Sequence, residues 1–277
     1  MDRVLEDKVI AVTGAGGVLC SEFARHFAAL GAKVALINRS TEKIEALEKE
    51  LTAQGLHARA YQANVLDAEA LAAVHSRILD DFGPVDILVN GAGGNMAAAN
   101  TGNEYHENVL DPSVRTFFDL DMDSVSGVFE LNFLGTLLPT KEFAGDMIGR
   151  EGCSILNVSS MSSYKPLTKV LGYSAAKAAV NNLTQWLAVH FSHMGIRVNA
   201  VAPGFFSTKQ NKTLLYDEEG NLTERSRKIL AGTPMGRFGV PEDLLGTVTY
   251  LADPKASGFV TGVLIPVDGG FNAYSGV

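Results

Sequence analysis

Short apolar runs rich in β-branched residues alternate with amphipathic segments along the whole chain. This alternation is typical of βαβ units, in which helices connect parallel strands and cover both faces of one sheet. We expect strands at residues 8–13, 33–38, 57–62, 85–90, 153–159, 196–201 and 262–267. Segments with helical spacing lie at 21–30, 41–54, 67–82, 122–148, 174–193 and 241–252. The pattern predicts an α/β fold with a doubly wound, mostly parallel sheet of seven strands.

The domain organisation is expected to be simple. Neither a Pro- or Ser-rich linker nor an internal repeat divides the 277 residues, so we expect one domain over 1–277. Two stretches, 94–121 and 203–240, are longer than a crossover needs, and each follows the carboxyl end of a strand. Ligands bind at that edge of open α/β sheets, so these stretches are expected to build a substrate site. Within the second, the long polar segment 205–235 is predicted to be a lid, or else a mobile surface loop.

Charge and cysteine content exclude several classes of function. The net charge of −8 has the wrong sign for binding nucleic acid or an anionic membrane. No apolar run approaches the roughly 20 residues of a membrane span, and the N-terminus is acidic, so we expect a cytoplasmic protein. Cys20 and Cys153 lack metal-ligand or CxxC spacing, which predicts buried reduced thiols and no metal site.

A glycine-rich turn connects the first predicted strand to the next helix. Its sequence from Thr13 is TGAGGVLC, with Gly14, Gly16 and Gly17 available for close approach of the backbone. In this setting backbone N–H groups can bind a pyrophosphate, although a tight turn without a ligand would look the same. The turn therefore makes a dinucleotide site a hypothesis that needs support elsewhere in the chain.

That support comes from the end of the second predicted strand, where such folds bind the adenosine ribose. The residues there are Asn38, Arg39 and Ser40. An acidic side chain would bind the ribose 2′-hydroxyl, whereas neutral Asn38 does not repel a phosphate and Arg39 can bind one. The interpretation favours NADP over NAD, with a solvated surface role for Arg39 as the alternative.

The strongest chemical pattern is Tyr173-Ser-Ala-Ala-Lys177. Residues four apart share one helix face, so the lysine ammonium is expected beside the phenol and should lower its pKa toward the working range of an acid–base catalyst. Ser160, at the end of the fifth predicted strand, could hold the substrate oxygen beside Tyr173. An exposed Tyr/Lys pair is the alternative, because YxxxK alone is common.

Taken together, seven motifs in order resemble the classical short-chain dehydrogenase/reductase family over nearly the whole chain. They are TGAGG at 13–17, NGAG at 90–93, ELNFLGT around Asn132, NVSS ending at Ser160, the Tyr173/Lys177 pair, RVNAVAPG at 197–204 and VTGVLIPVDGG at 260–270. The resemblance implies a Rossmann-type fold and an enzyme that moves hydride between a nicotinamide cofactor, NADP or NAD, and a CH–OH group.

The same resemblance implies roles for individual residues. Asn132, Ser160, Tyr173 and Lys177 would form a catalytic tetrad, in which Tyr173 exchanges a proton with the substrate, Asn132 holds a water and Lys177 also binds the nicotinamide ribose. The cofactor site would comprise Gly14, Gly16, Gly17, Val18, Leu19, Asn38, Arg39, Ser40, Asn64, Val65, Asn90, Gly91, Ala92, Gly93, Tyr173, Lys177, Pro203, Gly204, Phe206 and Thr208.

The turn departs from the family pattern TGxxxGxG. Val18 and Cys20 stand where its second and third glycines belong. We expect Gly16 and Gly17 to permit the close approach instead, and the small cysteine to allow tight packing of helix against strand. If they do not, cofactor binding is weakened.

Several segments are similar to the branch of the family described as D-mannonate oxidoreductases or fructuronate reductases. They include GAGGVLCSEFA, FFDLD at 117–121, SSMSSYKPLTKV at 159–170 and the ending DGGFNAYSGV. The resemblance implies a sugar-acid substrate, for which the polar candidates are Asn95, His106, Lys165, Lys169, Lys209, Asn211 and Lys212. Each of these could equally be solvated surface.

Two alternatives to this function remain open at the level of sequence. A gluconate-type or other polyol dehydrogenase would use the same tetrad with a different substrate loop. A non-catalytic dinucleotide sensor is favoured only by the altered glycine turn. The resemblance also implies a homotetramer, because helices 122–148 and 174–193 are apolar on more than one face and the NAYSGV ending could reach a neighbouring subunit.

Overall fold

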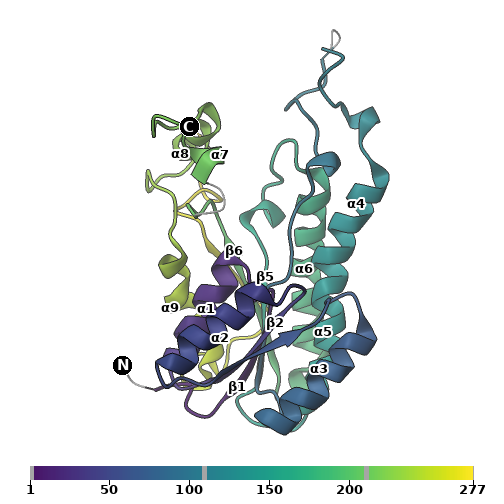
Figure 1. The fold of residues 1–277 in the computed structure, drawn as a ribbon. Coiled ribbons are helices and arrows are strands. Elements are labelled where there is room, and N and C mark those ends of the chain that lie inside the picture. The colour runs from purple at the N-terminus through teal and green to yellow at the C-terminus, as the bar shows by residue number, and fades with distance from the viewer. Residues whose placement is uncertain (1–2, 108–110, 209–211, 277) are drawn as a thin grey trace.

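A computed structural model describes residues 3–107, 111–208 and 212–276, with Lys212 described by its backbone only. Seven parallel strands form one sheet in the order β3-β2-β1-β4-β5-β6-β7 (Figure 1). The strands are β1 (Val9–Thr13), β2 (Lys33–Asn38), β3 (Ala58–Gln62), β4 (Ile87–Asn90), β5 (Ser154–Val158), β6 (Arg197–Pro203) and β7 (Leu264–Val267). The predicted seven-stranded Rossmann-type sheet is confirmed.

Helices cover both faces of this sheet (Figure 1). One face carries α1 (Val18–Ala29), α2 (Glu42–Ala53) and α9 (Leu245–Ala252), and the other carries α3 (Ala68–Asp81), α5 (Gly135–Phe143) and α6 (Leu171–His190). Successive strand residues point to opposite faces, so Ile10 and Val12 join the first core while Val9 and Ala11 join the second. Burial on both sides explains why central strands such as β1 and β4 are mainly apolar runs.

The predicted helix 122–148 differs from expectation because it is not one continuous α-helix. It consists of α4 (Met122–Phe129), a π-helical turn at Glu130–Leu134, α5 and a 3₁₀ turn at Ala144–Met147. Pro139 lies inside α5 and has no N–H to donate. Asn132 lies in the π turn, and such turns re-aim the side chains that they carry.

Both long stretches lie beyond the carboxyl edge of the sheet, as predicted. The segment after β4 carries two short 3₁₀ turns, at Ala97–Ala99 and Phe117–Asp119. The segment after β6 carries α7 (Lys212–Leu215) and α8 (Glu224–Ala231), two helices that the pattern analysis does not predict. A last short helix, α10 (Pro254–Ser257), precedes β7. No helix in the described ranges is long and apolar enough to cross a membrane.

Candidate active site

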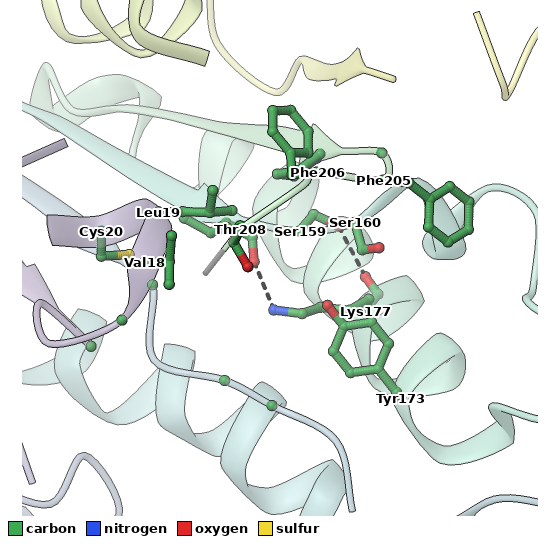
Figure 2. Close-up of a pocket in the computed structure, with 18 of the residues that line it drawn as sticks. Val18, Leu19, Cys20, Ser159, Ser160, Tyr173, Lys177, Phe205, Phe206 and Thr208 are labelled. Carbon is green, nitrogen blue, oxygen red and sulfur yellow. Dashed lines mark hydrogen bonds between the residues drawn. The ribbon is translucent and has the colours of Figure 1, made fainter. Parts of the chain in front are cut away.

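A pocket of about 390 Å³ opens at the carboxyl edge of the sheet. The glycine-rich turn and α1 form one wall, and the ends of β4, β5 and β6 form the floor. Residues of α6, α7 and α8 complete it. Figure 2 shows Val18, Leu19 and Cys20 on one side of this pocket, and Ser160, Tyr173 and Lys177 on the other.

The pocket brings together Ser160, Tyr173 and Lys177. Ser160 follows the end of β5, and the other two lie near the start of α6. Ser160 caps the 3₁₀ turn at Met161–Ser163, where its hydroxyl accepts a hydrogen bond from the Ser162 N–H at 3.2 Å. Tyr173 and Lys177 lie one turn apart on α6, with the Lys177 Nζ 5.7 Å from the centre of the tyrosine ring. The predicted juxtaposition of these three side chains is therefore present.

The electrostatics of the three groups differ from expectation in one respect. Burial raises the pKa of Tyr173, and the hydrogen bond with Ser160 opposes that rise. Lys177 does not contribute to the shift in the pKa of Tyr173. The Lys177 Nζ donates to the Val158 carbonyl at 2.7 Å. Burial lowers the pKa of Lys177 to about 8, so its ammonium form still predominates at neutral pH.

Asn132 is buried behind the pocket and does not line it. Its amide Nδ2 donates to the carbonyls of Gly94 and Val128, both at 2.7 Å, and its Oδ1 accepts from the Gly94 N–H at 3.3 Å. A Cβ on Gly93 would lie 2.6 Å from this Oδ1. Asn132 therefore fixes the loop after β4, and its predicted role as a water ligand stays a prediction.

The glycine-rich turn has the backbone geometry that a dinucleotide needs. Gly14 has a φ of +67°, and a Cβ there would lie 2.8 Å from the Ala92 nitrogen. Gly17, Val18 and Leu19 line the pocket, and so do Gly91 and Gly93 from the facing loop. Since several bare backbone segments border one cavity, the residues present fit a pyrophosphate-containing cofactor.

The predicted adenosine-side residues lie outside the pocket, at the ends of neighbouring strands. The Asn38 amide donates to the backbone and side-chain oxygens of Ser40, at 2.9 and 3.1 Å, and Gly16 packs against Asn38. Arg39 is exposed, and its guanidinium makes no ion pair or hydrogen bond within the described part of the chain. This arrangement leaves Arg39 accessible to a ligand.

Three further predicted cofactor residues have other partners. The Asn64 Oδ1 accepts from the Leu66 N–H at 3.2 Å, and Val65 packs against Gly135. The buried Asn90 amide donates to Thr140 and to Asn157, both at 2.9 Å. Asn90 therefore belongs to the polar interior beneath the site. Ala92 lies outside the pocket lining as well.

All four cofactor residues predicted at the end of β6 and just after it lie at the pocket. Pro203, Gly204, Phe206 and Thr208 all line the pocket. A Cβ on Gly204 would lie 2.6 Å from Asp268, so the loop after β7 packs directly against this position. The contact between the loop after β6 and the loop after β7 therefore determines where the segment after β6 leaves the sheet.

Of the candidate substrate-binding lysines, Lys165 and Lys169 do not line this pocket. The Lys165 Nζ donates to the Tyr274 carbonyl at 2.7 Å and so secures the C-terminal segment. Lys169 lines a neighbouring pocket of about 530 Å³. Asn95 is exposed and hydrogen-bonds Asn100, and His106 lies edge-on to Phe118 in a third, smaller pocket. Lys209, Asn211 and the Lys212 side chain lie outside the described residues.

Sequence reasoning missed several lining residues. They are Cys20, Gly94, Val158, Ser159, Phe205, Leu214, Leu215, Arg225 and Ile229. Five of them, Phe205, Leu214, Leu215, Arg225 and Ile229, lie in the segment predicted as a lid, but no motif in that segment distinguishes the residues that face the pocket. The only sequence feature that pointed to these residues was the length of the segment and its position after a strand.

The chain belongs to the short-chain dehydrogenase family. The model of that family, described as short chain dehydrogenase, matches residues 8–219. The enzyme class predicted from the tetrad is thereby confirmed: the protein is an NAD(P)-dependent oxidoreductase acting on alcohol groups.

Relatives at higher identity cover almost the whole chain. An uncharacterized oxidoreductase of Haemophilus influenzae is 54% identical, over 99% of this chain and 96% of its own. A crystal structure of a candidate D-mannonate oxidoreductase from Haemophilus influenza, with bound NAD, is 53% identical with a TM-score of 0.96, covering 99% of this chain and 98% of that one. A gluconate 5-dehydrogenase of Gluconobacter oxydans is 33% identical over 94% of this chain and 92% of its own.

Proposed function

We propose that this protein interconverts D-fructuronate and D-mannonate with a nicotinamide dinucleotide. The observation that carries the proposal is the meeting of Ser160, Tyr173 and Lys177 with the glycine-rich turn in a single pocket. The choice of substrate is supported by the 53% identical structure described as a candidate D-mannonate oxidoreductase.

In this proposal the chain's own residues handle the proton. During reduction, the Tyr173 phenol donates its proton to the keto oxygen of the substrate. During oxidation, the deprotonated phenol accepts the proton of the hydroxyl group. The Ser160 hydroxyl stabilises the phenolate and orients the substrate oxygen, and Lys177 adds a positive charge on the same side. The dinucleotide, when bound, supplies or accepts the hydride.

For the cofactor, we propose NADP as the preferred form and NAD as the alternative. Asn38 is neutral and Arg39 is exposed, so the site offers a cation and no carboxylate to a 2′-phosphate. The relative at 53% identity was crystallised with NAD, which favours the alternative.

A gluconate-type dehydrogenase is the second candidate, and the 33% identical gluconate 5-dehydrogenase supports it. That name places the reaction at carbon 5 of a six-carbon acid. The keto group of fructuronate corresponds to carbon 5 of mannonate, so both candidates have the carboxylate and the reacting carbon at the same separation. They differ only in the configuration of the remaining hydroxyl groups.

A substrate panel with NADH and NADPH tests the proposal. We expect D-fructuronate to have the highest kcat/KM among keto acids and keto sugars. Equal or faster turnover of 5-ketogluconate would replace our choice with the gluconate-type function.

The mechanism is tested with Tyr173→Phe. Turnover should fall by about 10²- to 10⁴-fold, the usual contribution of a positioned general acid or base, while the cofactor still binds. Cofactor binding is measured by quenching of the Trp186 fluorescence or by calorimetry. An unchanged rate would contradict the proton-transfer role of Tyr173.

We also propose a homotetramer that acts in the cytoplasm. Trp186 and Val189 on α6 are 58% and 77% exposed, and Met122 and Phe129 on α4 are exposed as well. Apolar side chains gathered on two long neighbouring helices favour a subunit interface. Light scattering coupled to size-exclusion chromatography measures the oligomeric state, and a monomer at micromolar concentration would contradict the proposal.

A further inference from the structure

The charges around the active-site pocket are all of one sign. Among the described residues that line it, Lys177 and Arg225 are the charged ones, and none is acidic. This is notable in a chain whose net charge is −8. Lys177 lies beside Tyr173, so Arg225 is a second positive charge on a different wall.

Arg225 lies in α8, close to its first residue, Glu224. Together with Phe205 and Ile229 it also lines the 530 Å³ pocket, so these three residues form the wall between the two cavities. Apart from Arg225, the described side chains of α7 and α8 that line the active-site pocket are apolar: Leu214, Leu215 and Ile229. Among these described residues, Arg225 is the one whose side chain can pair with an anion.

The two other cations of α8 are already engaged. Lys228 pairs with Glu104 at 3.2 Å and with Glu224 at 3.6 Å, and Arg227 donates to the Leu222 carbonyl at 2.6 Å. Arg225 has no hydrogen bond or ion pair within the described ranges. The Lys228–Glu104 pair also connects α8 to the segment after β4, which helps to hold the helix in place beside the pocket.

We propose that Arg225 binds the carboxylate of the substrate and selects acids over neutral polyols. This inference rests on the proposed function, in which the substrate is a sugar acid. Its carboxyl carbon and its reacting carbon are four bonds apart, roughly 5 Å in an extended chain with bonds of about 1.5 Å. With the reacting oxygen at Tyr173, a carboxylate at this separation can lie elsewhere in the same cavity, which Arg225 also lines.

Arginine suits this task because its planar guanidinium donates two parallel hydrogen bonds to a carboxylate. In a neutral polyol a CH₂OH group replaces the carboxylate and gains no charge-assisted bond. Arg225 is therefore a specificity-determining residue, and it takes no part in the proton transfer at Tyr173.

The test compares Arg225→Met with Arg225→Lys and with the control Arg227→Met. Arg227 lies on the same helix and lines neither of the two large pockets. For each variant, kcat/KM is measured for D-mannonate and for D-mannitol, which carries CH₂OH in place of the carboxylate. The KM for the dinucleotide and the melting temperature are measured as well.

We expect Arg225→Met to lower kcat/KM for D-mannonate by about 10- to 100-fold, the effect of losing a charge-assisted hydrogen bond. The value for D-mannitol should change less than about twofold, and Arg225→Lys should recover part of the loss. Arg227→Met should leave the ratio of kcat/KM for D-mannonate to kcat/KM for D-mannitol unchanged.

If Arg225→Met leaves the ratio of kcat/KM for D-mannonate to kcat/KM for D-mannitol unchanged, the inference is overturned. A rise in the KM for the dinucleotide with no change in the ratio would also overturn it, since Arg225 would then bind a cofactor phosphate. If the wild-type enzyme prefers another hydroxy acid and Arg225→Met loses that preference, the role of Arg225 stands while the choice of D-mannonate falls. A wild-type preference for D-mannitol would overturn both.

Discussion

The Sγ atom of Cys20 occupies the space beside Gly91 that a side chain on residue 91 would need. Cys20 stands where the family pattern has a glycine, and Gly91 lies on the facing loop after β4. Thr13 holds that loop against the turn, because its Oγ1 accepts from the Gly91 and Ala92 N–H groups at 3.1 and 3.3 Å. Cys20 therefore fits at a glycine position of the family pattern because Gly91, on the other side of the contact, has no side chain.

This complementarity predicts that Gly91→Ala destabilises the protein by about 1–3 kcal/mol, the usual cost of overpacking a close contact. Adding Cys20→Gly should recover part of that loss, because the sulfur is the nearest obstacle. Free energies of unfolding from urea titration measure the coupling between the two sites. Gly145→Ala is the matched control, since a Cβ there meets nothing within 4 Å. Strictly additive effects of the two substitutions would contradict the complementarity.

Ser160→Ala should shift the pH dependence of alcohol oxidation to higher pH. The Ser160 hydrogen bond lowers the pKa of Tyr173 against the effect of burial, so removing it raises that pKa. In the proposed mechanism the deprotonated phenol is the base in oxidation, and a higher pKa leaves less of this form at a given pH. The profile of kcat/KM against pH, measured for wild type and variant, checks the direction. A shift toward lower pH would contradict the assigned hydrogen bond.

Arg39→Ala should weaken the binding of NADPH much more than the binding of NADH. The loss of one cation at a phosphate removes a charge-assisted contact worth about tenfold or more in affinity, whereas the 2′-hydroxyl of NADH does not depend on it. The KM values for both cofactors measure the difference, and Lys43→Ala, at an exposed cation in α2, serves as the control. Equal effects on the two cofactors would show that Arg39 does not bind a 2′-phosphate.

Neither cysteine should react with a thiol reagent in the native protein at pH 8. Burial raises the pKa of Cys20 to about 12 and also raises the pKa of Cys153, so burial disfavours the reactive thiolate at both positions. Both should react at once in denaturant. Absorbance of released thionitrobenzoate gives the number of reactive thiols, and the variants Cys20→Ser and Cys153→Ser assign them. Rapid reaction of native Cys20 would show that the turn opens to solvent.

Much of the fold and part of the site follow from local sequence pattern. The central strands β1, β2, β4, β5 and β6 were predictable because they are buried on both faces, which favours a continuous apolar run bounded by polar turns. Tyr173 and Lys177 were predictable as neighbours because the helical period places residues four apart on one face. Ser160 and the glycine-rich turn were predictable at the same edge because parallel strands all end there.

Other features depend on contacts between segments far apart in the chain. Lys165 looked available for a substrate, yet its ammonium binds the carbonyl of Tyr274. Arg225 carried no motif, and it lines the pocket only because α8 packs beside the sheet edge. The fit of Cys20 against Gly91 joins the first crossover to the loop after β4.

The sequence alone determined the layers of the fold, the sheet edge that carries the candidate site and the proximity of Tyr173 to Lys177, because these follow from helix and strand periodicity. The tertiary structure decided which polar side chains face the pocket and which are used elsewhere. The physical reason is that a charged side chain is bound by whichever oppositely polarised group lies within hydrogen-bonding distance, and that distance is set by packing between segments rather than by spacing along the chain.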